Sequence, residues 1–454
     1  MNIIVLGAGA FGTAIGNELS VNLDNNVLLF SSNNLKIDEI NSCHTNKLCF
    51  PNKQLSMNLK ATSDMNDISN SDVIFIALPS EVVIDLLTVL KPFFKKNALL
   101  INLSKGLFKD GLTIVESIKE KLELHNVVSL KGPSFATEVM DHADTLLTLG
   151  YERRDQYNLV HTILQNTSLH IDCTTDIRGV EVLSVLKNIY ALVLGIVDAK
   201  YNSPNTRFMI LTKAFSELRV LLRSLGGSEG TLFLACGFGD LCLTSLNDLS
   251  RNRTLGLLIG KGFFNSDYKS NSVILEGLIA VQLVYNIVPD HLRDDIPLLN
   301  MLYSFFNSES DILSVNFDEL LDRKYKTVLT YGTFDLLHYG HLEILKKASQ
   351  LGDKLVVGLS TDKFNSFKGK RCVLTYDKRK ELLESLDYVH KVIPEDNWEQ
   401  KIKDITENDV DIFVMGSDWE GKFDEIKNYC NVIYFPRTKG ISTTKLKSIL
   451  REEE

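Results

Sequence analysis

Thr-Tyr-Gly-Thr-Phe-Asp-Leu-Leu-His-Tyr-Gly-His, residues 330–341, joins a short apolar run to a segment with helical spacing. Val328–Tyr331 has the composition of a buried strand, a glycine ends it, and Leu342–Leu351 carries the apolar periodicity of a helix. His338 and His341 are therefore predicted to lie at a helix start, where unpaired N–H groups and the helix dipole favour an anion. Either histidine alone also fits a polar loop, but the spacing His-x-Gly-His after Gly-Thr-Phe predicts a phosphate site.

The segment from Lys326 to Leu450 carries further polar motifs in a fixed order. They are Ser360–Asp362, Lys368 and Lys370, Tyr376 and Arg379, Asn397–Lys401, Met415–Phe423 and Arg437–Thr444. With them the segment resembles the bacterial glycerol-3-phosphate cytidylyltransferases, a group of the His-x-Gly-His nucleotidyltransferases. The resemblance implies a Rossmann-like α/β nucleotidyltransferase domain. It also implies attack by the phosphate of sn-glycerol 3-phosphate on the α-phosphorus of CTP, which expels pyrophosphate.

The same resemblance implies roles for individual side chains, which stabilise charge on the phosphates rather than form covalent intermediates. Mg²⁺ is expected to accompany CTP without a dedicated protein cage, so we predict no metal-ligating residues. The implied residues are His338, His341, Thr333 and Phe334 at the α-phosphate, Lys368 and Lys401 at the acceptor phosphate, Lys370 at CTP, and Arg437, Gly440, Ile441, Ser442, Thr443 and Thr444 at the β- and γ-phosphates.

Composition places the chain among soluble globular proteins. Its 454 residues, 44% hydrophobic and 24% charged, indicate about three domains. The net charge of −9 argues against a nucleic-acid or anionic-membrane surface, and the seven scattered cysteines indicate reduced thiols in the cytoplasm. The chain starts in a predicted strand rather than a signal peptide, and the apolar run Ile189–Val197 is too short to span a bilayer, so we expect no membrane insertion.

A glycine-rich turn lies at the start of the chain. The β-rich run Asn2–Leu6 precedes Gly-Ala-Gly-Ala-Phe-Gly, and the helical pattern Thr13–Asn22 follows it. This is the context of a dinucleotide fingerprint, in which Gly7 makes the tight turn, Gly9 lets the backbone approach the pyrophosphate, and Gly12 allows close packing of helix on strand. The sequence therefore predicts a Rossmann domain that binds a dinucleotide.

The choice between NAD and NADP stays open at this stage. The next strand, Val27–Phe30, is not followed by the acidic residue that binds a ribose 2′-hydroxyl in the NAD pattern, whereas Lys36 could approach a 2′-phosphate, which slightly favours NADP. Further strands are predicted at Val73–Leu78 and Leu99–Leu103, each followed by a helical stretch, which continues the alternation of a parallel sheet.

After about residue 175 helical signals dominate. The long apolar helix predicted over Val180–Asp198 holds Lys187 in its middle, a costly place for a charge without a partner or a task. The ordinary alternative is a lysine that reaches the surface along its own stem. Asp240 is the carboxylate expected to hold Lys187, and Ser250–Arg253 offers a guanidinium fork and amides suited to a phosphate.

Residues 1 to about 306 resemble the sn-glycerol-3-phosphate dehydrogenases. The motifs that carry this resemblance are Gly-Ala-Gly-x-Phe-Gly-Thr-Ala, Ser-Lys-Gly-Leu, Gly-Pro-Ser-Phe-Ala, Leu-Lys-Asn, Gly-x-Gly-Asp-Leu, Ser-Arg-Asn-Arg and Leu-Glu-Gly, in that order. The family's reaction is hydride transfer between NAD(P)H and the C2 carbonyl of dihydroxyacetone phosphate. The resemblance implies that Lys187 is the general acid, that Lys105 polarises the carbonyl and lowers the pKa of Lys187, and that Asp240 fixes both lysines.

The remaining residues that this resemblance implies line the cofactor and the substrate. The implied cofactor contacts are Gly7, Gly9, Ala10, Phe11, Gly12, Lys105, Ala136, Arg251, Ile274 and Glu276. The implied substrate contacts are Lys105, Gly132, Ser134, Lys187, Asp240, Ser250, Arg251 and Asn252.

The two resemblances together predict a bifunctional enzyme whose halves share sn-glycerol 3-phosphate. We expect a Rossmann domain over residues 1–175, an all-helical substrate domain over 176–306, a linker over 307–325 and a cytidylyltransferase domain over 326–454. We also expect a cytoplasmic homodimer that makes CDP-glycerol for a bacterial wall or capsule polymer. Two alternatives stay open, a non-catalytic nucleotide-binding or dimerisation role for the first half and a different polyol phosphate as acceptor.

Overall fold

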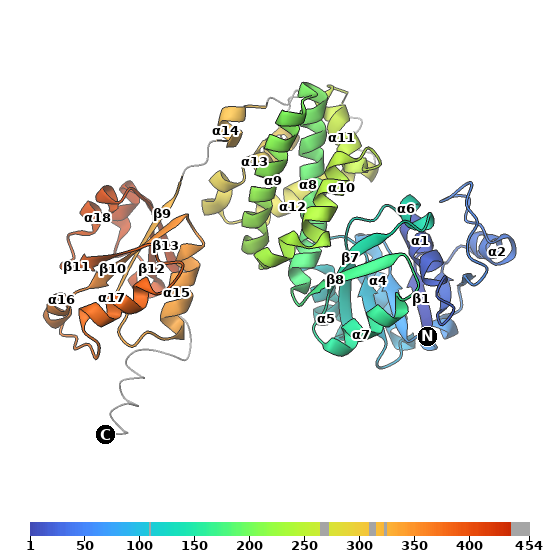
Figure 1. Cartoon of the computed structure of the whole chain (residues 1–454), viewed down its shortest axis with the longest axis horizontal. Helices are drawn as coiled ribbons and strands as arrows, with labels where there is room; N and C mark the ends of the chain where they lie inside the picture. The colour runs from blue at the N-terminus through green and yellow to red at the C-terminus, as the bar shows by residue number, and fades with distance from the viewer. Residues whose placement is uncertain (109, 264–271, 308–314, 322–324, 437–454) are drawn as a thin grey trace, which may run out of the picture. The chain divides into compact units, whose positions relative to one another are not determined.

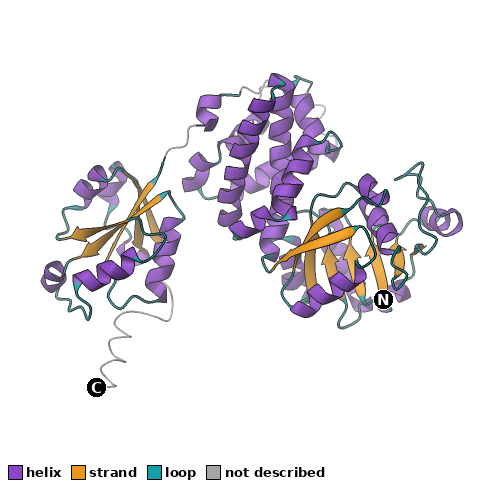
Figure 2. Ribbon diagram, viewed as in Figure 1, coloured by secondary structure: helices purple, strands orange, loops and turns teal. Residues whose placement is uncertain are grey.

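The computed structural model describes residues 1–108, 110–263, 272–307, 315–321 and 325–436, and the chain separates into two compact units, Met1–Leu321 and Asp322–Glu454. Each unit is built around its own parallel sheet (Figure 1). The first unit adds a bundle of helices after its sheet, whereas the second has short helices around a smaller sheet (Figure 2).

The first sheet holds eight strands in the order β3-β2-β1-β4-β5-β6-β7-β8. All neighbours pair in parallel except β6 and β7, which pair antiparallel. The strands are β1 (Asn2–Leu6), β2 (Asn26–Phe30), β3 (Lys60–Thr62), β4 (Val73–Ile76), β5 (Leu99–Asn102), β6 (Val127–Lys131), β7 (Thr145–Gly150) and β8 (Leu169–Thr174). The helices between them are α1 (Ala10–Leu19), α2 (Asn34–Cys43), α3 (Met65–Ser69), α4 (Ser80–Leu90), η1 (Lys91–Phe93), α5 (Ile114–Leu122), α6 (Ala136–Met140) and α7 (Arg154–Ile163).

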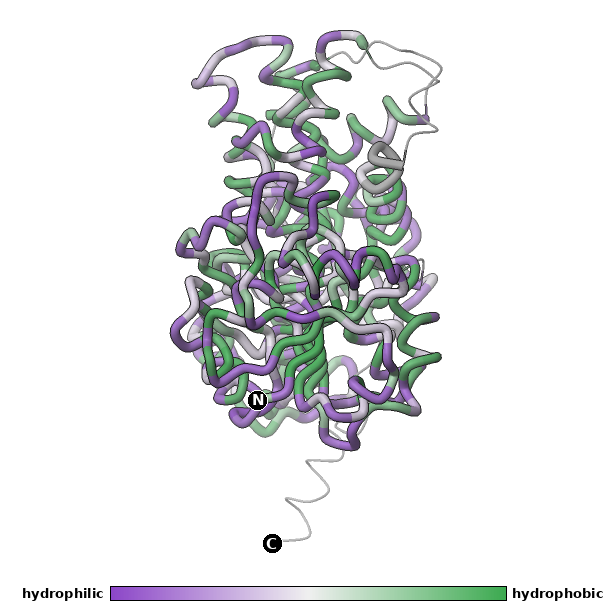
Figure 3. Tube along the Cα trace, turned by 90° about the vertical axis from the view of Figure 1, so that its right-hand side faces the viewer, coloured by the Kyte–Doolittle hydropathy of each residue, from purple (hydrophilic) through white to green (hydrophobic). Residues whose placement is uncertain are grey.

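Helices cover both faces of this sheet because its strands are apolar on both sides. In β1, Ile3 and Val5 pack into a core with α1, α6 and α7, whereas Ile4 and Leu6 point to the opposite core, formed with α3, α4 and α5. Figure 3 shows hydrophobic stretches of neighbouring strands side by side near the N-terminus, with hydrophilic segments in the outer loops. The carboxyl ends of β1, β4, β5 and β6 therefore meet along one edge, where such sheets bind ligands.

The helical part of the first unit packs around one central helix, α8 (Ile177–Tyr201). Among the described residues, α8 is the one helix long and apolar enough to cross a membrane, with a mean hydropathy of 1.9 over an 18-residue window that is entirely buried. The helix is longer than the apolar run Ile189–Val197, and it contains Lys187. The helices around it are α9 (Pro204–Ser224), η2 (Glu229–Phe233), the π-helix η3 (Ala235–Gly239), α10 (Asp240–Leu246), α11 (Arg251–Gly260), α12 (Ser272–Ile287), η5 (Asp290–Asp295), α13 (Pro297–Asn307) and α14 (Phe317–Leu321).

The second unit has a five-stranded parallel sheet in the order β11-β10-β9-β12-β13. In β9, Val328 packs toward α15 and α17, whereas Leu329 and Tyr331 pack toward α18 and η7. The strands are β9 (Thr327–Gly332), β10 (Lys354–Ser360), β11 (Lys391–Glu395), β12 (Val410–Gly416) and β13 (Asn431–Phe435), and the helices are α15 (Tyr339–Ser349), α16 (Asp362–Phe367), α17 (Tyr376–Glu384), α18 (Lys401–Glu407), η6 (Ser417–Trp419) and η7 (Asp424–Asn428).

This architecture confirms the predicted fold class, an α/β sheet domain, a helical domain and a second α/β sheet domain. Several predicted boundaries shift by a few residues, as in α8 (Ile177–Tyr201) and α15 (Tyr339–Ser349), and two of the shifts have a local cause. The first helix begins at Ala10 rather than Thr13, because Gly9 is its N-cap and the glycine motif itself forms the first turn. The strand predicted over Val73–Leu78 ends at Ile76, because Ala77 turns to pack against the glycine loop.

Candidate active sites

The glycine turn after β1 has the shape that a dinucleotide needs. Gly7 has a φ of +109°, and a Cβ there would stand 2.5 Å from the carbonyl oxygen of Ala77. A Cβ at Gly12 would clash with the carbonyl of Gly7, so α1 can pack this closely on the turn only with glycine. A Cβ at Gly9 would meet no atom within 4 Å, which leaves the N-cap of α1 open for an anionic group.

The helix that follows β2 brings a cation to this turn. Asn33 caps α2 by accepting a hydrogen bond from the backbone N–H of Lys36, and the Lys36 ammonium donates to the carbonyl of Ala8 at 2.9 Å. Lys36 therefore lies beside the glycine loop, as its proposed contact with the cofactor requires. Together with the open N-cap at Gly9, this arrangement fits a dinucleotide.

A buried ion pair joins Lys187 to Asp240 in the helical part of the first unit. Their side chains are 5% and 2% exposed. Burial lowers the pKa of Lys187 to about 7; Asp240 opposes this shift, and the ammonium of Lys105 adds to it. Within the described residues, the Oδ2 atom of Asp240 is buried without a hydrogen-bond partner. This lysine can therefore exchange a proton near neutral pH, and the carboxylate keeps one oxygen for a further donor.

The backbone around Asp240 is unusual. The π-helix η3 runs directly into α10, so Asp240 is the first residue of an α-helix that starts from a widened turn. A Cβ at Gly237 would clash with the carbonyl of Leu232, so the turn needs glycine there. Short π-helical segments often occur at functional sites, because the extra residue redirects a side chain.

Lys105 lies just past the end of β5, close enough to the Lys187 ammonium for its own charge to lower the pKa of Lys187. It also lines a cavity of about 70 Å³ between the sheet and the helices, together with Asn188 of α8 and Ala280 of α12. Lys105 and Lys187, which are far apart in sequence, thus meet where the carboxyl edge of the sheet faces the helical part.

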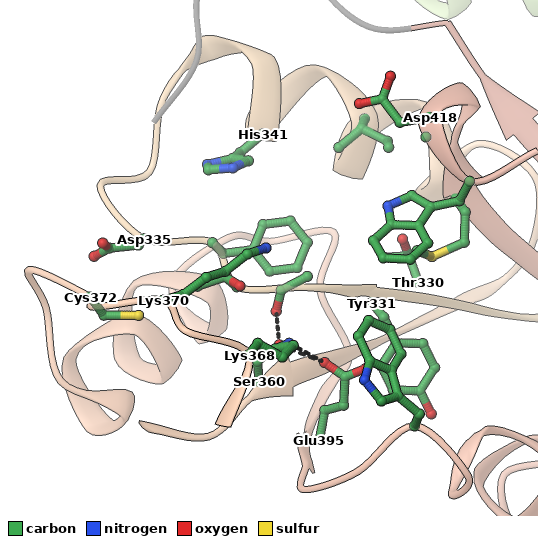
Figure 4. Close-up of a pocket in the computed structure, with 18 of the residues that line it drawn as sticks. Thr330, Tyr331, Asp335, His341, Ser360, Lys368, Lys370, Cys372, Glu395 and Asp418 are labelled. Atoms are coloured by element: carbon green, nitrogen blue, oxygen red, sulfur yellow. Dashed lines mark hydrogen bonds and ion pairs between the residues drawn. The ribbon is translucent and has the colours of Figure 1, made fainter. Parts of the chain in front are cut away.

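A larger cavity, of about 670 Å³, lies at the carboxyl ends of β9, β10, β11 and β12 in the second unit (Figure 4). Its walls combine cations, aromatic rings and polar turns, which suits a nucleoside triphosphate and a phosphate monoester. The sequence-predicted residues that line it are Thr333, Phe334, His341, Lys368, Lys370 and Lys401.

The two histidines of the His-x-Gly-His motif lie face to face. His338 is the N-cap of α15, and its ring stacks on that of His341 with centroids 3.8 Å apart and planes inclined by 17°. Phe334 meets His341 edge-on at 5.3 Å. Burial and, to a smaller extent, the neighbouring His338 lower the pKa of His341 to about 4, although Asp335 opposes this shift. His341 is therefore neutral at physiological pH and can act as a hydrogen-bond donor rather than as a cation.

Two lysines in the wall of this cavity share one carboxylate. Glu395, at the end of β11, lies 2.9 Å from the Lys401 ammonium and 3.5 Å from that of Lys368. Ser360, at the end of β10, donates to Glu395 at 2.5 Å and accepts from Lys368 at 2.8 Å. The ends of β10 and β11, together with Lys368 after α16 and Lys401 at the start of α18, thus present two positive charges and one negative charge to the cavity.

Comparison with known proteins gives the same division of the chain. The N-terminal and C-terminal family models of NAD-dependent glycerol-3-phosphate dehydrogenase match residues 2–157 and 176–315, and the cytidylyltransferase-like family model matches residues 329–449. A glycerol-3-phosphate cytidylyltransferase of Bacillus spizizenii is 61% identical over 122 residues, which cover 27% of this chain and 95% of that protein.

The first unit has relatives of its own. A glycerol-3-phosphate dehydrogenase [NAD(P)+] of Neorickettsia sennetsu is 30% identical over 311 residues, which cover 68% of this chain and 91% of that protein. The crystal structure of glycerol-3-phosphate dehydrogenase from Coxiella burnetii superposes with a TM-score of 0.61 at 28% identity and covers 68% of this chain and 95% of that one. The chain belongs to both families. It is an NAD(P)-dependent glycerol-3-phosphate dehydrogenase fused to a glycerol-3-phosphate cytidylyltransferase.

The dehydrogenase unit contains a second buried lysine that sequence reasoning left without a role. Lys131, the last residue of β6, lies 3.3 Å from Glu181 of α8 and donates to the carbonyl of Asn102 at 2.8 Å. Glu181 also accepts from Asn102 at 2.6 Å and from Ser129 at 2.7 Å. Burial lowers the pKa of Lys131 to about 8, although Glu181 opposes this shift. The pair ties the sheet edge to α8, and its one sequence signal is a lysine in an apolar strand.

The remaining dehydrogenase residues are placed as follows. Ser250 caps α11 by accepting from the N–H of Arg253, while Arg251 is exposed at the helix start. Arg253 is buried and ion-paired with Asp198 at 2.6 Å, so it holds α11 on α8. Asn252 faces α12 near Gly277, Gly132 and Ser134 follow β6, and Ala136 begins α6. The side chains of Ile274 and Glu276, in α12, lie outside the described part of the structure.

In the cytidylyltransferase unit, buried polar residues hold the turn that carries the motif. Phe334 and Leu336 both have positive φ, at +46° and +49°, a conformation that side chains rarely adopt. Arg379, fully buried, donates to the carbonyls of Thr333 and Ser360 at 2.7 and 2.9 Å. These hydrogen bonds hold the turn in position, so Arg379 supports the site without lining it. Arg437, Gly440, Ile441, Ser442, Thr443 and Thr444 lie outside the described residues.

Gly9→Ala tests the glycine turn without disturbing the fold. We expect NAD(P)H to bind about tenfold more weakly or worse, because the added methyl stands where the backbone has to approach the pyrophosphate. Thermal unfolding should stay unchanged, because that methyl meets no neighbour. Titration of the reduced cofactor by fluorescence measures this, with Gly230→Ala, whose Cβ would lie 3.8 Å from Ser228, as the matched control. Unchanged affinity in Gly9→Ala would place the cofactor elsewhere.

Proposed function

We propose that this enzyme carries out two consecutive reactions. The dehydrogenase unit reduces dihydroxyacetone phosphate to sn-glycerol 3-phosphate with NAD(P)H, and the cytidylyltransferase unit then transfers CMP from CTP to that product, which yields CDP-glycerol and pyrophosphate. The observation that carries this proposal is that both families act on glycerol 3-phosphate while each unit keeps a buried, charged site. One metabolite therefore connects the two halves of the chain.

In the reduction, the nicotinamide supplies a hydride to the C2 carbonyl of the substrate. Lys187 gives a proton to the oxygen at C2 as negative charge develops there, and in the reverse direction it takes that proton back. Lys105 polarises the same carbonyl, and Asp240 orients the Lys187 ammonium through their ion pair. Arg251, with Ser250 and Asn252, binds the substrate phosphate, and Gly132 and Ser134 line the substrate site together with Lys105. Gly7, Gly9, Ala10, Phe11, Gly12, Lys105, Ala136, Arg251, Ile274 and Glu276 hold the cofactor.

In the transfer reaction, the acceptor phosphate attacks the α-phosphorus of CTP and pyrophosphate leaves from the opposite side. His338 and His341 donate hydrogen bonds to the α-phosphate oxygens, with Thr333 and Phe334 forming the adjoining turn. Lys368 and Lys401 bind the acceptor phosphate, and Lys370 contacts CTP. The segment Arg437–Thr444 binds the β- and γ-phosphates. In the described part of the chain, no three His, Cys, Asp or Glu side chains form a metal site, and we propose that Mg²⁺ arrives with the triphosphate.

The proposed product, CDP-glycerol, suggests the pathway and the compartment in which the enzyme acts. CDP-glycerol is an activated polyol phosphate, so we propose that it supplies a bacterial wall or capsule polymer from the cytoplasm. We also propose a homodimer, a linker near residues 307–325 and a boundary near residue 175 between the Rossmann and helical domains. The preference between NAD and NADP remains open, with Lys36 beside the glycine turn favouring NADP slightly.

The two alternatives make different predictions. A non-catalytic first unit has no need of a buried lysine paired with a buried carboxylate, because such a pair is costly to bury, so the Lys187–Asp240 pair argues against it. A different acceptor would leave the histidines unchanged and alter the environment of Lys368 and Lys401. Competition between sn-glycerol 3-phosphate and other polyol phosphates for cytidylyl transfer separates these acceptors.

The pH dependence of the reduction tests the role of Lys187. Because Lys187 has to be protonated to act as an acid, kcat/KM for reduction should fall about tenfold per pH unit above its pKa. Oxidation of glycerol 3-phosphate needs the deprotonated amine, so its kcat/KM should rise as the pH approaches this pKa from below and level off above it. Cytidylyl transfer in the same samples, between pH 7 and 9, serves as the control. Profiles that move in the same direction for reduction and oxidation would contradict the assignment.

A further inference from the structure

The carboxylate of Glu395 is the centre of the charged wall in the cytidylyltransferase cavity (Figure 4). Its side chain is 3% exposed and accepts from Ser360 at 2.5 Å and from Lys401 at 2.9 Å, with Lys368 at 3.5 Å. Its own backbone carbonyl accepts from Thr361 at 3.0 Å, which anchors the end of β11 to the end of β10. Glu395 is therefore held by the sheet, and the two lysines are held by Glu395.

Aromatic rings cover further sides of the same two ammonium groups. Lys401 lies 4.5 Å from the ring centre of Tyr331 and 4.8 Å from that of Trp398. Lys368 lies 4.0 Å from the ring centre of Phe364 and 5.2 Å from that of Trp398. Rings and carboxylate together fix the direction in which each lysine can offer its remaining N–H groups, and all three charged residues line the cavity.

The charge of this cluster suits a phosphate monoester. Two ammonium groups this close repel one another, and the buried carboxylate between them removes most of that repulsion. One positive charge remains on the cluster. Elsewhere in the cavity wall, Lys370 and Arg371 add positive charge, and Asp335 and Asp418 add negative charge. A monoester phosphate carries close to two negative charges at neutral pH, as a phosphorylated side chain does. The net positive charge of the cluster therefore favours the acceptor phosphate.

We infer that Glu395 is a positioning residue for cytidylyl transfer, which holds Lys368 and Lys401 so that both ammonium groups face the phosphate of the acceptor. The inference rests on the proposed acceptor role of the two lysines. Glu395 itself repels the acceptor phosphate and acts through the lysines, so its effect should appear in the binding of the acceptor and not in that of CTP.

Glu395→Gln tests this inference in the full-length enzyme. The variant keeps the shape of the side chain and removes its charge, so the lysines lose their shared counter-ion. We expect KM for sn-glycerol 3-phosphate to rise about tenfold or more, while KM for CTP stays within about twofold. Asp411→Asn is the matched control, because Asp411 is another acid of this unit and accepts from the backbone N–H of Thr327 at the amino ends of the strands, away from the cavity.

A pH series separates positioning from a purely structural role. Burial lowers the pKa of Lys368, and Glu395 opposes that shift, while Lys370 and Lys401 reinforce it. With glutamine at position 395, Lys368 should lose its proton at a lower pH than in the parent enzyme. KM for the acceptor should then begin to climb at a lower pH in the variant than in the parent. A loss of packing alone would not produce this shift.

Several outcomes would overturn the inference. Equal changes in both KM values, or unchanged acceptor KM in Glu395→Gln, would show that Glu395 does not act through the acceptor. If Glu395→Gln does not fold, Glu395→Asp, which keeps the charge on a shorter side chain, carries the same test with an expected rise of about threefold. Lys401→Met and Lys368→Met make the failures distinguishable. If the two lysine variants raise only KM for CTP, the proposed acceptor site is wrong. If they raise KM for the acceptor but Glu395→Gln does not, the acceptor site stands and only the role of Glu395 is refuted.

Discussion

Lys187→Ala is expected to lower kcat for the reduction of dihydroxyacetone phosphate by a factor on the order of 10²–10⁴, because the reaction loses its proposed general acid. Cytidylyl transfer from added sn-glycerol 3-phosphate will proceed at the parental rate, because the transfer site lies in a separate unit with its own core. Cofactor oxidation measured at the nicotinamide band and CDP-glycerol measured by chromatography report the two activities on one sample.

The control has to account for the cost of breaking a buried ion pair. Removing Lys187 leaves the carboxylate of Asp240 buried without its partner, which destabilises the unit by about 3–5 kcal/mol. Lys131→Met breaks another buried pair of the unit, that with Glu181, and should cost similar stability with a far smaller loss of reduction. Equal losses of reduction in the two variants would mean that Lys187 matters only for folding, and loss of both activities would argue against independent sites.

His341→Ala will have the opposite effect. Cytidylyl transfer should fall by a factor on the order of 10²–10³, which is typical when one donor to a developing phosphate charge is lost, and reduction should be unaffected. Because burial lowers the pKa of His341 to about 4, its imidazole is neutral between pH 6 and 8. Titration of His341 should therefore cause no change in the parental transfer rate over this pH range. Initial rates of pyrophosphate release measure both.

His390→Ala is the matched control for this variant. His390 belongs to the same unit, lies at the surface and accepts a hydrogen bond from the backbone of Leu355 outside the cavity. We expect it to keep both activities. If His341→Ala retains transfer within about threefold of the parent, the His-x-Gly-His motif does not hold the α-phosphate.

Much of both sites follows from local sequence, because parallel sheets bring the residues after their strands to one edge. Gly7, Gly9 and Gly12 lie between a β-rich run and a helical pattern, so this short stretch predicts the strand, turn and helix that the structure contains. His338 and His341 are one helical turn apart, and their stacking follows from that spacing. Each of these motifs is read from a few consecutive residues.

Contacts between distant segments could not be derived in the same way. Glu395 and Lys368 are 27 residues apart in the sequence, and Glu181 and Lys131 are 50 residues apart. The sequence around each carboxylate does not indicate which lysine it contacts. The widened turn before Asp240 also depends on tertiary packing, since the N–H of Cys236 donates to Thr148 of β7. Burial, which sets the pKa of Lys187 and His341, is likewise a property of the folded chain.

The most direct test of the two-step account is to supply the enzyme with dihydroxyacetone phosphate, CTP and Mg²⁺, with NADH and NADPH in parallel samples. Absorbance at the nicotinamide band and nucleotide products are followed together. We predict that CDP-glycerol forms only when a reduced cofactor is present and that its amount matches the cofactor oxidised. If no cofactor is oxidised, yet added sn-glycerol 3-phosphate still gives CDP-glycerol, the first unit does not catalyse reduction and the account is wrong.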